Sequence, residues 1–137
     1  MQAVAVVRKL MKNDKVLVNM EYGNLRDSGS EKYTQFIGML LEESDVIFNA
    51  NGVSNKIDER RDEGIVSYLD VDVNVGNGMT ATGNFTAPIS GIYYFHFQAV
   101  SECKEEVRHE VEMYLNEKLV TKSYNKHVRN ALFKELR

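Results

Sequence analysis

The strictest constraint on the fold is the alternation of side chains in residues 92–100, IYYFHFQAV. One parity of this run holds mainly aromatic side chains: Tyr93, Phe95, Phe97 and Ala99. The other parity is more polar: Tyr94, His96 and Gln98. A period of two indicates a β-strand with one face in a core. We therefore expect the aromatic parity to be buried, where each ring contributes on the order of 2–3 kcal/mol of transfer free energy.

Residues 64–124 contain several more short strands separated by turn signals. Alternating or β-branched runs predict strands at 65–75, 84–87, 107–115 and 119–124. Turn signals lie between them: GNGMTATG at 76–83, the single proline Pro88, and Asn116-Glu117. In the first of these strands we expect the apolar parity to face the core: Ile65, Leu69, Val71, Val73 and Val75. Many short strands with turns between them are typical of a β-sandwich or barrel.

Residues 3–41 give a less definite pattern. The run 3–14, AVAVVRKLMKND, fits a helix or a strand, whereas 15–22, KVLVNMEY, alternates like a strand. Residues 33–41, YTQFIGMLL, place apolar side chains at helical spacing, and Ser28-x-x-Glu31 ahead of them matches a helix capping box. Gly38 and its β-branched and aromatic surroundings instead favour two buried strands joined by a short polar turn. Periodicity alone leaves both interpretations open.

Composition excludes several classes of protein. The chain has 137 residues, which fits one domain, and a formal net charge of −3 with both signs mixed along it. A nucleic-acid binder would show a basic face, and no apolar run approaches the ~20 residues that span a bilayer. The N-terminal stretch is broken by Arg8 and Lys9, which makes it a poor signal peptide and, taken literally, predicts a cytoplasmic chain. A single cysteine, Cys103, cannot form an internal disulfide.

The polar residues give no catalytic or metal-binding pattern. The three histidines, His96, His109 and His127, fall on different predicted elements, and none is paired in sequence with Cys103 as a nucleophile and base. The run Asp70-x-Asp72-x-Asn74 starts like a calcium-binding loop, but its glycine stands one position late and its twelfth position is Ala81 rather than Glu. We therefore expect no catalytic, cofactor-binding or metal-binding residues, and a protein that is not an enzyme.

Residues 83–97, GNFTAPISGIYYFHF, contain the pattern G-x-F-T-A-P-x-x-G-x-Y-x-F-x-F. This pattern resembles the globular domain of the complement C1q family, a relative of the tumour necrosis factor fold. Residues 68–76 resemble the family's F-D-x-V-x-x-N-x-G, with Tyr68 in place of Phe. VIFNA at 46–50 resembles its opening strand and VEMYLNEKLV at 111–120 resembles one of its hairpins. The resemblance implies an all-β jelly-roll sandwich whose structural motif residues are Phe36, Gly38, Tyr68, Asn74, Gly83, Phe85, Pro88, Gly91, Tyr93, Phe95 and Phe97.

The order of the matching segments is unusual. Residues 46–124 resemble the family's opening strands, whereas 3–41 resemble its last three strands. In the latter segment, TQFIGMLL resembles the family's closing T-x-F-x-G-x-L-L. Earlier in the same segment, Asn13 stands where the family's pattern has a glycine. The resemblance therefore favours a strand over a helix for 33–41, and a single sandwich over 1–124 followed by a tail at 125–137. Two origins remain open: a circular permutation, or a segment across the junction of two tandem domains that closes on itself or swaps strands.

The resemblance also implies a function. Members of this family form trimers, and the parity of Tyr94, His96 and Gln98 is one candidate for the contact between subunits. They are mostly extracellular, lectin-like proteins of innate immunity that bind a glycan, a microbial surface or a protein ligand. Some bind calcium, which cannot be assigned to residues here. The alternative is a structural or assembly fragment, or a strand-swapped subunit, that has no ligand of its own.

Overall fold

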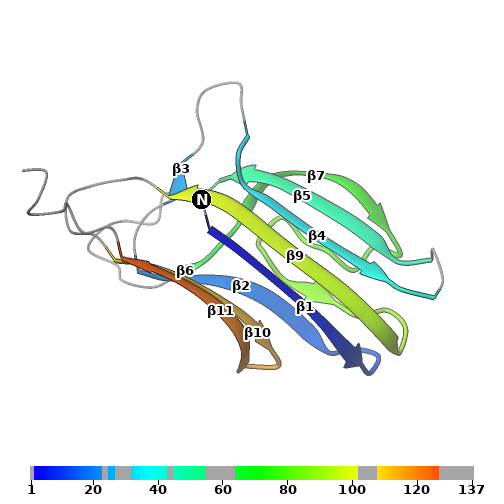
Figure 1. Cartoon of the computed structure of the whole chain (residues 1–137). Helices are drawn as coiled ribbons and strands as arrows, with labels where there is room; N and C mark the ends of the chain where they lie inside the picture. Colours follow the sequence, from blue (N-terminus) through cyan, green and yellow to red (C-terminus); the bar gives the residue numbers. More distant parts are fainter. Residues whose placement is uncertain are drawn as a thin grey trace, which may run out of the picture.

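The computed structural model describes residues 2–22, 25–26, 32–42, 45–54, 64–101 and 108–126. All regular secondary structure in these ranges is β-strand (Figure 1). The strands are β1 (Gln2–Leu10), β2 (Lys15–Tyr22), β3 (Leu25–Arg26), β4 (Gln35–Leu40), β5 (Ile47–Val53), β6 (Gly64–Ile65), β7 (Tyr68–Val75), β8 (Phe85–Thr86), β9 (Gly91–Ser101), β10 (Arg108–Leu115) and β11 (Lys118–Lys126). The capping box at 28–31, Cys103 and His127 lie outside the described residues.

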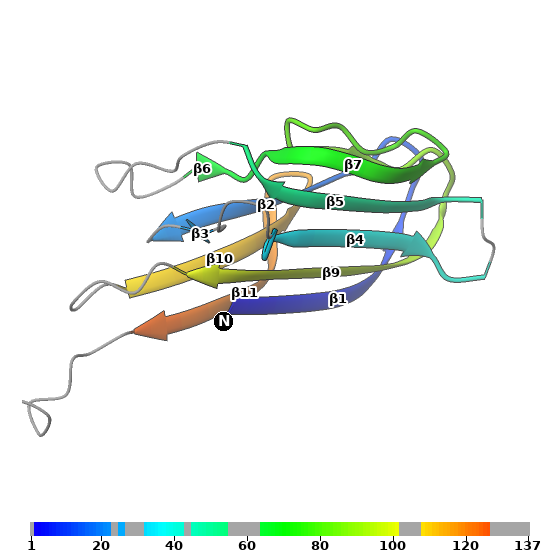
Figure 2. The ribbon, with the colours of Figure 1, turned by 90° about the horizontal axis from the view of Figure 1, so that it is seen from above.

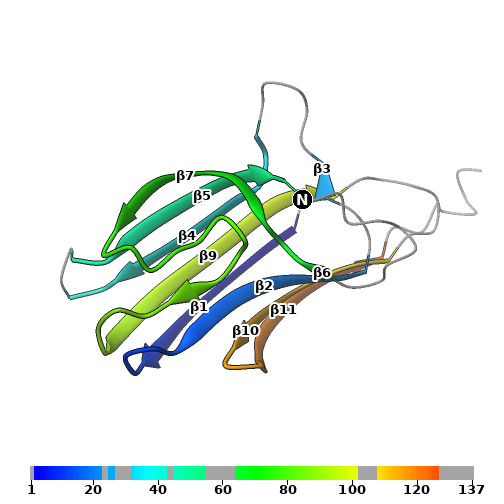
Figure 3. The same ribbon diagram turned by 180° about the vertical axis from the view of Figure 1, so that it is seen from behind.

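The strands form two antiparallel sheets that pack face to face, so the predicted all-β sandwich is confirmed. One sheet has the order β1-β9-β4-β5-β7, with β3 pairing the end of β9. The other has the order β11-β10-β2-β6, with β8 also pairing β2. Figure 2 shows β1, β9, β4 and β5 side by side in the first sheet, and Figure 3 shows β2, β10 and β11 in the second.

Residues 35–40 form a strand, and the helical interpretation of this segment is wrong. β4 pairs antiparallel with β9 on one side and with β5 on the other. Phe36 lies opposite Phe97 and Ala50, and Gly38 lies opposite Phe95 and Phe48. The helical spacing of the apolar residues in 33–41 arises because both faces of this strand are apolar, which periodicity cannot separate from a helix stripe.

Each sheet takes one of its inner strands from the N-terminal 40 residues. β4 separates β9 from β5, and β2 separates β10 from β6 and β8. In β2 the parity of Val16, Val18 and Met20 is buried against the partner strand's Val111 and Met113. Without these two strands, neither sheet would be continuous.

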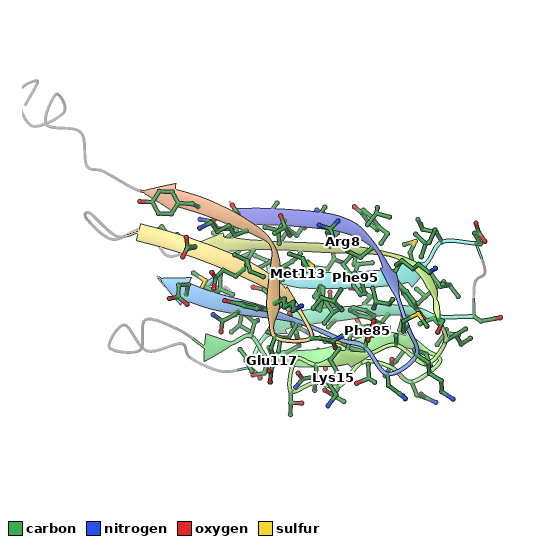
Figure 4. The ribbon with its side chains drawn as sticks, turned by 90° about the horizontal axis from the view of Figure 1, so that it is seen from below. Arg8, Lys15, Phe85, Phe95, Met113 and Glu117 are labelled. Atoms are coloured by element: carbon green, nitrogen blue, oxygen red, sulfur yellow. The ribbon has the colours of Figure 1, made fainter. Side chains whose placement is uncertain are left out.

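The core between the sheets is built from aromatic rings. Phe36 meets Phe48 edge to face with ring centres 4.9 Å apart, and Phe48 stacks on Phe85 at the same distance. Phe85 also contacts Phe95, with centres 5.4 Å apart. Phe85, Phe95 and Met113 are all buried in this core, and Figure 4 labels them where strands of the two sheets overlap in the view. Packing of this kind adds about 0.5–1.5 kcal/mol per ring pair beyond the buried area.

Turn geometry fixes the ends of these strands. Asn13 has a φ of 76°, which lies in the left-handed conformation that favours glycine. This conformation explains why the family pattern has a glycine at the position that Asn13 occupies here. Asn74 holds the loop after β7 in place, because its side-chain amide donates to the Met79 carbonyl at 2.8 Å and accepts from the Met79 N–H at 3.1 Å. The Tyr93 hydroxyl donates to the Ile89 carbonyl at 2.6 Å, next to Pro88.

The buried face predicted for residues 65–75 is wrong, although β7 itself is present. Leu69 and Val75 are 54% and 48% exposed, and only Val71 of this set packs against the core. Ala50 pairs with Val71 but its neighbour Asn49 pairs with Val73, so Asp72 is an extra residue that reverses the parity of the strand. β7 also lies at the edge of its sheet, and Ile65 belongs to β6 in the other sheet.

Candidate functional site

The outer face of the sheet β1-β9-β4-β5-β7 carries three rows of side chains that cross the strands. The strand registers define an apolar row: Val7, Tyr94, Met39, Ile47 and Val75. The next residues along the same strands form a middle row: Ala5, His96, Ile37, Asn49 and Val73. The third set forms a polar row: Ala3, Gln98, Gln35, Asn51 and Asp70. We call these three rows together the outer face.

The first two rows of the outer face hold mainly apolar side chains, and the sheet end beyond them combines the apolar Leu41 and Ile92 with Lys9, which lies opposite Ile92. Val7 and Val75, at the two ends of the apolar row, are each 48% exposed. Leu41 and Ile92, next to this row, are exposed as well and are joined by a backbone hydrogen bond of 2.9 Å. The apolar and middle rows contain no Asp, Glu, Lys or Arg. Large contiguous apolar patches are in general a feature of protein interaction sites.

The sequence forms this patch because three strands have apolar residues on both parities. β4 reads QFIGML, β5 starts IFNA, and β1 contains VAVV. A strand that packs one face on a core and exposes the other usually alternates apolar with polar residues. Strands that are apolar on both faces are typical of sheets covered on both sides. The outer face therefore has the residue pattern of a sheet face that packs against another layer.

The middle row contains polar groups with specific geometry. The rings of Tyr94 and His96, neighbours on this parity of β9, are nearly parallel with centres 6.5 Å apart. The Oδ1 atom of Asn49 is buried and has no hydrogen-bond partner among the residues that the structure describes. A buried acceptor without a donor costs about 1–3 kcal/mol.

The polar row forms the boundary of the patch. Asp70 at the end of this row pairs with Lys32, and the side-chain amide of Asn51 donates to the carboxylate of Asp72. These exposed pairs contribute little stability, since surface ion pairs are usually worth 0–1 kcal/mol by rough estimate. Their effect is to make one end of the outer face polar while the other end stays apolar.

The predicted residues divide between the core and this face. The motif aromatics Phe36, Tyr68, Phe85, Tyr93, Phe95 and Phe97 are all buried between the sheets. Tyr94, His96 and Gln98 lie on the outer face, one in each row. Sequence reasoning did not place Ile37, Met39 or Ile47 there. The signal that could have found them was the presence of apolar residues on both parities of their strands.

The described histidines lie in different sheets. His109 is buried on β10 in the other sheet, away from His96 on β9. Within the described parts of the chain, no group of three His, Cys, Asp or Glu side chains could hold a metal ion. These parts also contain no helix that is long and apolar enough to cross a membrane.

A comparison with protein families identifies one match. The family model described as the C1q domain matches residues 48–134, which is more than half of the chain. The matched segment starts inside β5, so β1, β2 and β4 lie before it. No curated protein and no solved structure matches the chain significantly.

Proposed function

Because the chain belongs to the C1q domain family, we propose that it is a recognition module that assembles into a homotrimer through its outer face. C1q domains are in general non-enzymatic modules that oligomerise and bind ligands, and they are typically extracellular. The observation that supports assembly through this face is the absence of Asp, Glu, Lys and Arg from its apolar and middle rows. Covering these rows with further copies of the chain would bury the exposed valines and isoleucines.

A threefold assembly also suits the polar groups of the outer face. In a closed threefold ring, each copy contacts its two neighbours through two different patches, and both patches would lie within the outer face, so that no copy of this face remains uncovered. The polar row would then lie at the rim of the contact, where charged and amide groups stay hydrated.

We further infer that residues 3–41 take the place of the strands that close the family's sandwich. The family match covers 48–134 only, and the strands before it supply β2 and β4, inner strands of the two sheets. β4 pairs with β5 across the short connection at 41–46, as expected if the closing strand had been joined to the opening strand. This order would arise by circular permutation, or in a segment that spans the junction of two tandem domains.

The ligand class that we propose is a glycan, a microbial surface or a secreted protein, bound in the extracellular space. This proposal rests on the family membership and on the sequence resemblance. Screening the purified protein on arrays of glycans and secreted proteins tests it, and a chain that binds nothing on either array would contradict it.

The proposed assembly is tested by sedimentation velocity of the purified chain at micromolar concentration. We expect one species with three times the mass of a single chain. A folded monomer would contradict the trimer, and a species of two chains would point instead to a strand-swapped dimer.

A further inference from the structure

The outer surface of the second sheet contains a groove on the side of the sandwich opposite the outer face. One hollow of about 410 Å³ is lined by Lys15, Leu17, Asn84, Tyr114, Asn116 and Glu117. A second hollow of about 280 Å³ is lined by Leu17, Asn19, Tyr114 and Glu117. Because three residues line both hollows, we treat them as one feature and call it the Leu17–Tyr114 groove. Figure 4 shows Lys15 and Glu117 at the start of β2 and in the β10–β11 turn.

The floor of this groove is set by strand pairing. Tyr114 on β10 lies directly opposite Leu17 on β2, and both point away from the core because Met113 and Val18 beside them are buried. A tyrosine ring beside an aliphatic side chain gives a flat surface that is apolar at its centre and polar at its edge. Such a floor binds the apolar face of a flat ligand.

The orientation of the Tyr114 ring is fixed by a buried carboxylate. Glu112 is only 7% exposed, and its Oε1 atom accepts a hydrogen bond from the Tyr114 hydroxyl at 2.9 Å. The same atom accepts from the side-chain amide of Asn19 at 3.3 Å. Hydrogen bonds to a carboxylate are stronger than neutral ones, so they hold both lining residues in place before any ligand arrives.

The wall of the groove is also formed in advance. Asn116 and Glu117 both have left-handed backbone conformations, with φ of 48° and 67°, as required in a tight hairpin turn. The side chain of Asn116 accepts from the Lys15 N–H at 2.9 Å and donates to Asp14 at 2.9 Å. These contacts tie the β10–β11 turn to the start of β2, so the groove is a fixed feature of the fold.

The chemistry of the lining excludes several classes of ligand. A phosphate or another compact anion would meet Glu117 and the carboxylate of Glu112, which lies beside Tyr114 and opposite Asn19. A simple cation would meet Lys15 in the larger hollow, and no group of three His, Cys, Asp or Glu side chains among the described residues could hold a metal ion. A fatty acyl chain would need an enclosed apolar cavity, whereas amide side chains of Asn19, Asn84 and Asn116 line much of this open one.

A neutral sugar ring matches the floor of the groove and the amide side chains in its lining. It has an apolar face of C–H groups that suits the floor, and hydroxyl groups that both donate and accept, as the Asn19 and Asn84 amides do. The two linked hollows are larger together than one ring requires. We propose that the Leu17–Tyr114 groove binds a neutral oligosaccharide, with one sugar unit on Tyr114 and the next toward Asn19 or Asn84.

This inference rests on the proposed recognition function and specifies its ligand. Because the groove lies on the second sheet, assembly through the outer face of the first sheet would leave it accessible. Each copy in a trimer would then present one groove, and a surface that carries repeated sugars would be bound with an avidity above the affinity of one site.

The test is a titration of the ¹⁵N-labelled full chain with cellotetraose, mannotetraose and chitotetraose, followed by NMR. We expect saturable shifts with at least one of these sugars, centred on Leu17, Asn19, Asn84 and Tyr114. Tyr114→Ala should weaken binding by about tenfold or more, as truncation of a central aromatic contact does. The matched control is Tyr124→Ala, which removes an exposed tyrosine of β11 outside the groove and should leave the affinity unchanged.

Two further measurements keep the result decisive. Asn84→Ala changes a rim residue of the groove and should also weaken binding, so a misfolded Tyr114→Ala variant would not leave the proposal untested. Sedimentation velocity on each variant separates this proposal from the assembly, since trimers without sugar binding would overturn the groove assignment alone. Shifts at other residues, or saturable binding of inorganic phosphate or spermidine at the groove in place of the sugars, would also overturn it.

Discussion

The ring of Phe48 occupies the space where a side chain on Gly38 would lie: a Cβ atom on Gly38 would stand 2.1 Å from Phe48 Cε1. The two residues face each other across the β4–β5 pair. Phe95 on β9 closes the same space from the other side, with Cδ1 at 2.9 Å from that position. The close packing of three strands around this glycine therefore depends on β4 lying between β5 and β9.

Replacing Gly38 by alanine tests this packing. We expect Gly38→Ala to lower the free energy of unfolding by about 1–3 kcal/mol, because ring positions in a packed core can shift only with strain. Gly91→Ala is the control, since its Cβ would meet only Leu40 Cδ1, the end of a flexible side chain, at 2.5 Å. Urea denaturation of both variants measures the difference, and equal stability would contradict the described packing.

Tyr68 and Tyr93 should respond in opposite ways to removal of their hydroxyl groups. The buried Tyr68 hydroxyl has no hydrogen-bond partner among the described residues, whereas the Tyr93 hydroxyl donates to the Ile89 carbonyl. Tyr93→Phe should cost about 0.5–1.5 kcal/mol, and Tyr68→Phe should be neutral or stabilising. Thermal unfolding of the two variants checks this, and a large loss in Tyr68→Phe would reveal an unseen partner.

The buried hydroxyl group of Tyr68 also predicts how the stability of the fold changes in alkaline solution. Burial raises the pKa of the Tyr68 hydroxyl well above its ordinary value. The unfolded chain therefore loses this proton first, so the contribution to stability is complete below about pH 10 and is lost as the pH rises further. We expect Tyr68→Phe to reduce the fall in stability between neutral and strongly alkaline pH, as measured by urea denaturation at each pH.

Asn13 offers a test of backbone conformation in the turn between β1 and β2. Its φ of 76° favours glycine, so Asn13→Gly should be neutral or stabilising, whereas Asn13→Ala should cost about 1 kcal/mol. The two variants differ only in the Cβ atom. Equal stability of the two would contradict the left-handed conformation.

The strand content was predictable from sequence where period-two alternation was strong, as in Tyr93 to Ala99. It was ambiguous in 33–41, because Ile37 and Met39 are apolar on the same strand as Phe36 and Leu40. The resemblance to a known family resolved that ambiguity, and hydrophobic periodicity alone could not. The burial of Val73 and Val75 was mispredicted because the extra residue Asp72 reverses the parity of β7 after Val71. The sequence of one strand does not show where its pairing with a neighbouring strand contains such a bulge.

The two surfaces were predictable to different extents. Tyr94, His96 and Gln98 were expected on the exposed parity, and they lie on the outer face. The Leu17–Tyr114 groove was not predicted, because it depends on the pairing of two strands that are almost a hundred residues apart in the sequence. No local pattern specifies such a pair.

Introducing a charge into the apolar row should separate the copies without unfolding them. Val7 is 48% exposed, so Val7→Glu is tolerated in a single chain but would bury a carboxylate in the proposed contact. We expect light scattering to give the mass of one chain for this variant. Leu119→Glu is the control, since Leu119 is 46% exposed on β11 of the other sheet and its variant should assemble normally.

The most direct test of assembly through the outer face is hydroxyl-radical footprinting of the unmodified protein and of Val7→Glu at the same concentration. Met39 and Tyr94 of the apolar row report on the proposed contact, and the exposed Met11 and Tyr124 serve as internal references. We expect Met39 and Tyr94 to react more slowly in the unmodified protein than in the variant, while the two references react equally in both. Equal reactivity of Met39 and Tyr94 in the two proteins would contradict assembly through the outer face.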